Sequence, residues 1–140
     1  MADDFNILIR NCDEIERVAL AIGEFLGHPL PRMTSVEWKL YKTRSVGFEI
    51  SVFEADDFEN DAGIEFEKYP LMVGVDGLSI MTPVEHFDEW FRLFSLTLAS
   101  IISRKLECEC LLVKNFCHVV ASFPASASGE QRNPAPKAGG

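Results

Sequence analysis

The chain has 140 residues, with 22 Asp and Glu against 13 Lys and Arg, and a formal net charge of −9. This length favours a single domain with its own hydrophobic core, since domains commonly contain ~100–200 residues. The acidic balance argues against direct binding to nucleic acid or to an anionic membrane, because both are polyanions.

The chain begins Met1-Ala2-Asp3-Asp4, without the basic residues and apolar run of a secretory signal. We therefore expect a cytoplasmic protein. In that compartment cysteines remain reduced, so Cys12, Cys108, Cys110 and Cys117 are expected to be mostly buried free thiols.

The first third of the chain reads as a strand followed by a helix. Apolar and polar residues alternate over 5–10, and Asn11 with Glu14 resembles a capping box. Apolar residues then recur at helical spacing from Ile15 to Leu26, and Gly27 is a natural stop. Residues 28–31, with two prolines, predict a rigid connector.

The middle of the chain predicts strands. Alternating patterns cover 36–41, 48–53, 64–66 and 71–75, and the last ends at the turn signal Asp76-Gly77. Short polar breaks between these segments favour an antiparallel meander over parallel βαβ units.

A long helix is predicted from Thr82 to about Lys105. Thr82, Pro83 and Glu85 occupy N-cap, N1 and N3 positions. The predicted buried stripe comprises Phe87, Trp90, Phe91, Phe94, Leu98, Ile101 and Ile102. Leu93 and Leu96 fall off this stripe, so they either meet a second layer of the domain or form a patch for self-association.

Residues 108–123 predict a final β segment, and the Ala-, Ser-, Gly- and Pro-rich residues 124–140 predict a disordered tail. Together these elements predict one α+β domain over residues 1–123. Its centre would be a mostly antiparallel sheet of five or six strands with two helices, in the order β-α-β-β-β-β-α-β.

The negative charge is concentrated in one segment. Residues 45–67 contain eight Asp and Glu and no Lys or Arg. A solvated acidic loop is the simpler interpretation; the alternative is a docking surface for a basic protein. Phe58 lies inside this run and is either an aromatic anchor ringed by charge or part of the core. The candidate partner-binding residues are Glu54, Asp56, Asp57, Phe58, Glu59, Asp61, Glu65 and Glu67.

The sequence gives little support for metal binding or for catalysis. A calcium loop starting at Asp57 has Ala62 where Gly is needed and Lys68 where the bidentate Glu is needed. Cys108, Cys110, Cys117 and His118 lack zinc-knuckle spacing, and buried thiols in a strand explain the cysteines better. No nucleophile or phosphate-binding motif is present. We therefore expect a non-enzymatic protein without a cofactor or metal.

The stretch Asp61-Ala62-Gly63-Ile64-Glu65-Phe66-Glu67-Lys68-Tyr69-Pro70, an acidic run leading into a strand, resembles segments of the immunity proteins of bacterial contact-dependent and polymorphic toxin systems. The resemblance implies a protein that neutralises a cognate toxin domain, often a basic nuclease, by covering its active site. The implied partner is a basic protein, bound by a monomer or weak homodimer.

The alternative is a chaperone of the type III secretion kind, which would bind an effector segment as a homodimer. Those chains begin with a helix, whereas a strand is predicted first here.

Overall fold

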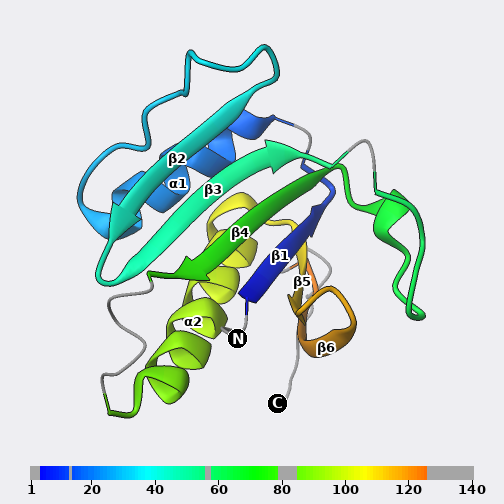
Figure 1. The fold of residues 1–140 in the computed structure, drawn as a ribbon. Coiled ribbons are helices and arrows are strands. Elements are labelled where there is room, and N and C mark those ends of the chain that lie inside the picture. The colour runs from blue at the N-terminus through cyan, green and yellow to red at the C-terminus, as the bar shows by residue number, and fades with distance from the viewer. Residues whose placement is uncertain (1–3, 13, 56–57, 79–84, 126–140) are drawn as a thin grey trace, which may run out of the picture.

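The computed structural model describes residues 4–12, 14–55, 58–78 and 85–125 (Figure 1). Within these ranges the chain order is β1 (Asp4–Arg10), α1 (Ile15–Leu26), β2 (Leu40–Ser45), β3 (Phe48–Glu54), the 3-10 turn η1 (Phe66–Lys68), β4 (Leu71–Gly77), α2 (Phe87–Leu106), β5 (Glu109–Lys114) and β6 (His118–Phe123).

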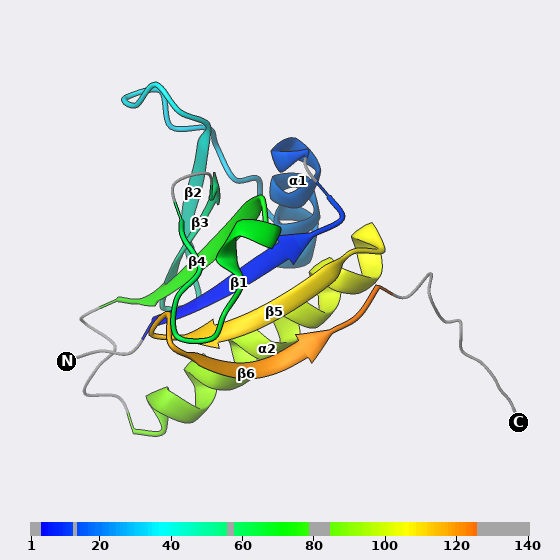
Figure 2. The same ribbon diagram turned by 90° about the vertical axis from the view of Figure 1, so that its right-hand side faces the viewer.

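The strands form one sheet in the order β2-β3-β4-β1-β5-β6, and every neighbouring pair is antiparallel. Both helices lie on one side of this sheet, and the loop that carries η1 lies on the other (Figure 2). The predicted α+β class, with two helices and an antiparallel sheet, is confirmed.

The main core lies between the sheet and the helices. Successive strand residues point to opposite faces, so Phe5, Ile7 and Ile9 of β1 enter this core while Leu8 enters a second cluster on the far face. Both faces of the central strands are therefore apolar, which explains the continuous burial of residues 5–9.

Helix α1 follows the predicted apolar spacing. Ile15, Val18 and Ile22 are buried, and Gly27 ends the helix in the left-handed conformation at φ 85°. The expected capping box at Asn11 is wrong. The N-cap is Glu14, whose side chain makes no capping hydrogen bond, and Asn11 has a φ of 70°.

Helix α2 begins at Phe87, and the expected caps Thr82 and Pro83 lie outside the described residues. Trp90 was expected on the buried stripe but is 43% exposed. The two leucines off the stripe separate: Leu96 is half-buried against the main core, whereas Leu93 is 54% exposed.

Three of the strand predictions differ from the structure in detail. The pattern at 36–41 contributes only its end, because β2 begins at Leu40 and Trp38 is exposed. The pattern at 64–66 forms an isolated bridge and η1 instead of a strand. The segment at 108–123 folds into two strands, β5 and β6, around a hairpin at Asn115 and Phe116, both with positive φ.

Candidate functional site

The loop between β3 and β4 carries most of the candidate binding residues. We call residues 54–67 the acidic loop. Its described carboxylates are all exposed: Glu54, Glu59, Asp61, Glu65 and Glu67. Asp56 and Asp57, the other two predicted carboxylates, lie outside the described residues.

Backbone hydrogen bonds close the acidic loop on itself. The Ala55 amide donates to the Pro70 carbonyl at 2.9 Å, which joins its two ends. Asp61 and Ile64 exchange two backbone hydrogen bonds, of 3.1 and 2.7 Å, around Ala62 and Gly63, which both have positive φ. This is the dihedral pattern of a tight type I′ turn, and it fixes the position of Asp61.

Two further hydrogen bonds involve side chains. The Glu67 amide donates to Asn60 Oδ1 at 3.0 Å, and the Tyr69 hydroxyl donates to Glu109 Oε2 of β5 at 3.3 Å. Desolvation and the neighbouring Glu109 carboxylate raise the pKa of Tyr69 above its usual value, so the hydroxyl keeps its proton. These hydrogen bonds hold the acidic loop together and connect the segment that follows it to the sheet.

Phe58 belongs to an aromatic cluster beneath the acidic loop. Its ring centroid lies 5.7 Å from Phe116, 5.9 Å from Phe66 and 6.5 Å from Phe53. These rings join the second hydrophobic cluster, which includes Ile64 and Met72. Of the two interpretations of Phe58, its contacts agree with the second, a ring that forms part of the core. The exposed carboxylates surround a loop interior that this ring anchors.

Ion pairing within the acidic loop is sparse. Lys68 Nζ lies 3.0 Å from Glu65 Oε2, and among the described residues no other ion pair involves a carboxylate of the acidic loop. By contrast, Glu49 of β3 sits 3.3 Å from Arg44 and 3.8 Å from Lys42. The negative charge of residues 45–67 is therefore neutralised at the strand and left open at the loop.

A row of three carboxylates crosses the face of the sheet on which the acidic loop lies. Asp76 of β4 lies opposite Asp4 of β1 on one side and Glu49 of β3 on the other. Partial desolvation, then Asp4 and Glu49, raise the pKa of Asp76, and Lys42 opposes them. The row lies at the ends of the strands remote from the acidic loop, and Glu49 is its member with basic partners.

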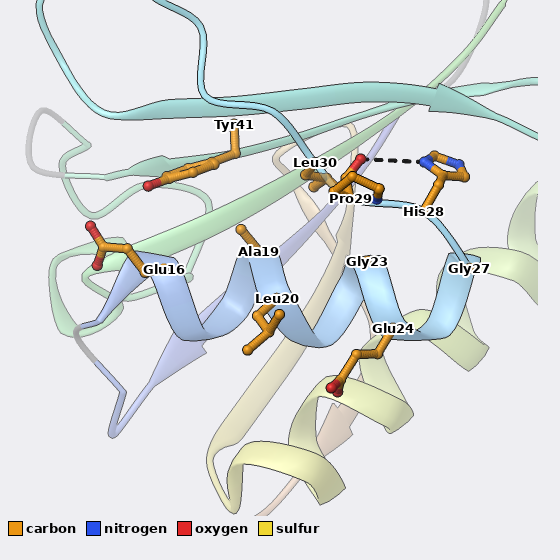
Figure 3. Close-up of a pocket in the computed structure, with 10 residues that line it drawn as sticks. All are labelled: Glu16, Ala19, Leu20, Gly23, Glu24, Gly27, His28, Pro29, Leu30 and Tyr41. Carbon is orange, nitrogen blue, oxygen red and sulfur yellow. Dashed lines mark hydrogen bonds between the residues drawn. The ribbon is translucent and has the colours of Figure 1, made fainter.

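A pocket of about 460 Å³ lies on the helical side of the molecule, between α1, the connector after it and β2 (Figure 3). Ala19, Leu20 and Gly23 of α1 line one wall, and Leu30 and Tyr41 line the other. The connector is held along β2, because the Lys42 amide donates to the Pro31 carbonyl at 3.2 Å. The volume suits an apolar side chain or a small apolar ligand.

Charged groups at the rim of this pocket are already paired. Lys39 Nζ donates to Glu16 Oε2 at 3.0 Å and lowers the pKa of that carboxyl. Lys105 of α2 donates to Glu24 Oε1 at 2.5 Å. The pocket therefore presents apolar surface with a balanced rim, unlike the acidic loop.

The cysteines and His118 do not form a ligand set. Cys108 and Cys110 are buried in the main core with their sulfurs 3.9 Å apart, whereas His118 is exposed at the start of β6. Cys12 is also buried and Cys117 is exposed, all four being free. Within the described ranges no group of three His, Cys, Asp or Glu residues is arranged to hold a metal ion.

Comparison with protein-family models, curated proteins and solved structures gave no match to this chain. Among the described helices, none has the length and apolar character to cross a bilayer.

Sequence reasoning missed the pocket and the charged row. Leu20 gave a local signal for the pocket, since it is apolar and lies off the buried stripe of α1. The row of Asp4, Glu49 and Asp76 had no local signal, because it depends on the pairing of three strands distant in sequence.

Proposed function

We propose that the protein is an immunity protein of the bacterial contact-dependent or polymorphic toxin kind described above, which binds a basic toxin domain through the acidic loop. The observation that supports the proposal is the combination of five exposed carboxylates with a loop interior of packed aromatic rings. A loop that only kept the protein dissolved would not need such an anchor.

The aromatic anchor bears on affinity. Ordering a flexible loop on binding costs conformational entropy, so a loop already held in place binds with a smaller penalty. The Phe58 ring and the Asp61–Ile64 turn fix the directions in which Glu59, Asp61 and Glu65 project. The carboxylates are thereby prearranged against Lys and Arg side chains of a partner.

The mechanism is occlusion with electrostatic steering. A toxin that acts on nucleic acid needs a basic cleft, and a cluster of carboxylates imitates the phosphates of its substrate. Opposite charges accelerate encounter and make the association rate depend on salt. The proposed partner is a basic toxin domain in the cytoplasm, and the mechanism requires no catalytic residue, cofactor or metal in this chain.

The proposal predicts a toxin gene beside the gene for this protein, and the test uses the toxin domain that this neighbour encodes. A variant carrying Glu59→Gln, Asp61→Asn, Glu65→Gln and Glu67→Gln should associate with that domain ~10-fold more slowly at low salt, and the difference should shrink at high salt. Protection of cells against the toxin should weaken in parallel.

A matched control separates local from global charge. Glu14→Gln, Glu37→Gln, Glu85→Gln and Glu107→Gln remove the same net charge from exposed positions outside the acidic loop. This control should retain most of the association rate. Equal slowing in both variants, or normal protection by the first, contradicts the assignment to the acidic loop.

The apolar pocket favours a second candidate, a secretion chaperone that holds an extended effector segment. An apolar side chain of that segment would enter beside Leu20 and Tyr41. Leu20→Arg should then abolish capture of the partner recovered from the native host, whereas neutralising the acidic loop should leave capture intact. The immunity proposal expects the opposite pattern.

A further inference from the structure

Helix α2 carries a second exposed stripe that the main core does not use. Trp90, Leu93, Thr97, Ile101 and Arg104 follow one another at intervals of three or four residues. At 100° per residue they fall within an arc of about 80°. Leu93 is 54% exposed and Trp90 43% exposed, so the stripe presents apolar surface to solvent.

Neighbouring elements broaden this stripe. Phe25 at the end of α1 packs against Phe94, which also contacts the ring of Trp90, and Phe25 is itself 36% exposed. The Trp90 indole N–H also donates to the Val46 carbonyl at 3.4 Å, and Val46 is 55% exposed. We call Phe25, Val46, Trp90, Leu93, Thr97 and Ile101 the α2 patch.

The charges around the stripe complement one another end to end. Asp88 and Glu89 lie in the first turn of α2, and Arg104 and Lys105 lie in the last turn. Asp88 points away from the stripe and Lys105 is bound to Glu24 of α1, so Glu89 and Arg104 are the two charges that border the stripe. If α2 meets the same helix of a second molecule in antiparallel orientation, Glu89 of each copy lies beside Arg104 of the other. The helix dipoles are then also opposed, which is favourable.

The register follows from the stripe itself. A two-fold axis through Thr97 sets Leu93 opposite Ile101 of the second copy and Trp90 opposite Arg104. The first pair is apolar, and the second brings a guanidinium to an indole ring, a favourable cation–π pair. Arg104 makes no ion pair within the described part of the chain, so it is available for that contact.

We propose that the α2 patch is the contact surface of a weak homodimer, in which α2 packs antiparallel against α2 of a second copy about an axis at Thr97. Such an isologous contact requires a surface complementary to itself, and this stripe meets that requirement. The acidic loop lies across the sheet from the helices, so the two regions of highest negative charge remain apart in the pair (Figure 2). The proposal is independent of the partner assigned to the acidic loop.

Cysteine cross-linking tests the register. In full-length protein with Cys117→Ser, Thr97→Cys should form a disulfide-linked dimer under oxidised glutathione, because facing Cα atoms at the axis of packed helices come within disulfide range. Arg92→Cys, on another face of α2, is the matched control and should stay monomeric on a non-reducing gel.

A mixed experiment tests the antiparallel orientation. Leu93→Cys protein mixed with Ile101→Cys protein should give the heterodimer, whereas Leu93→Cys alone should link poorly because two copies of residue 93 would lie about 12 Å apart along the axis. Strong self-linking by Leu93→Cys together with absence of the heterodimer overturns the proposed register.

Sedimentation equilibrium over a range of concentrations gives a measurement without cysteines. The native protein should show a concentration-dependent dimer, Leu93→Arg should lose it, and Leu20→Arg on α1 should keep it. A monomer at all concentrations overturns the proposal, as does loss of the dimer in Leu20→Arg alone. Loss of toxin binding in Leu93→Arg without a dimer in the native protein would assign the α2 patch to the toxin and also overturn it.

Discussion

The ring of Phe58, in the acidic loop, stacks on the ring of Phe116, in the β5–β6 hairpin, with centroids 5.7 Å apart and planes inclined by 24°. The two residues are far apart in sequence, and their contact connects the acidic loop to the opposite half of the sheet. The position of the surface carboxylates therefore depends on a hairpin that contributes no charge to them.

Removing this ring should loosen the acidic loop more than it weakens the fold. Phe58 is half-buried, so Phe58→Ala should cost on the order of 1 kcal/mol of unfolding free energy, less than a fully buried aromatic. Denaturant unfolding measures the loss, and hydrogen exchange should quicken at residues 58–68. Phe25→Ala, the control, removes an exposed ring from α1 and should leave exchange in the acidic loop unchanged.

Asp76 should destabilise the protein at neutral pH. Asp4 and Glu49 lie directly across the strands from it, and like charges in that arrangement are unfavourable by less than about 1 kcal/mol each. Because the folded state raises the pKa of Asp76, the folded protein holds this proton more tightly than the unfolded chain does.

The sign of the pH effect follows. Stability associated with that proton is complete below about pH 4 and is lost as the pH rises through the raised pKa. Asp76→Asn should therefore raise the melting temperature at pH 7, and the gain should disappear toward acid pH. Glu37→Gln removes an exposed charge elsewhere and should show no such trend; a gain for Asp76→Asn that grows on acidification would contradict the assignment.

Gly23 should resist replacement although it lies in a helix. Ala normally stabilises a helix interior by about 1 kcal/mol over Gly. Here a Cβ would lie 3.1 Å from the His28 carbonyl oxygen and 3.4 Å from Pro29 Cα. The connector cannot retreat easily, because the amides of Gly27 and His28 both donate to the Gly23 carbonyl, at 2.8 and 3.1 Å.

Gly23→Ala should thus lower the melting temperature instead of raising it, and thermal denaturation measures this directly. Ser100→Ala, a half-buried position in α2, provides the comparison for an ordinary helix site. A melting temperature of Gly23→Ala above that of the native protein would show that the connector gives way.

The four thiols should differ sharply in reactivity. The contact with Cys108 and burial raise the pKa of the Cys110 thiol, and Cys12 and Cys108 are likewise buried. A disulfide reagent should therefore label Cys117 rapidly in the native protein and the other three only at the rate of unfolding. Cys117→Ser should abolish the rapid phase, and more than one rapid thiol in the native protein would contradict the burial.

The sequence patterns predicted the two helices well, because short-range spacing and end signals largely determine them. The spacing from Ile15 to Leu26 and the glycine after it determine α1, and the aromatic stripe from Phe87 onward determines most of α2. The expected burial of Cys108 and Cys110 is confirmed, with Cys110 in β5 and Cys108 directly before it.

Some sequence patterns are compatible with more than one local structure, and here they led to wrong predictions. Ile64 and Phe66 alternate with acidic residues as a strand would, yet both reach the second cluster from a bridge and a 3-10 turn. Trp90 has an apolar side chain at helical spacing, but its helical angle places it between core and solvent. The acidic loop was recognised by composition, whereas its anchoring by Phe116 depends on a contact that no local pattern records.

The two hydrophobic clusters lie on opposite faces of one sheet, and this separation bears on how the protein can evolve. The helices and main core carry the stability of the fold, while the acidic loop rests on a small cluster of its own. Substitutions among Glu59, Asp61, Glu65 and Glu67 change surface charge without altering either cluster. Under the proposed function, the charge pattern that meets the partner can therefore change by substitution while the scaffold stays the same.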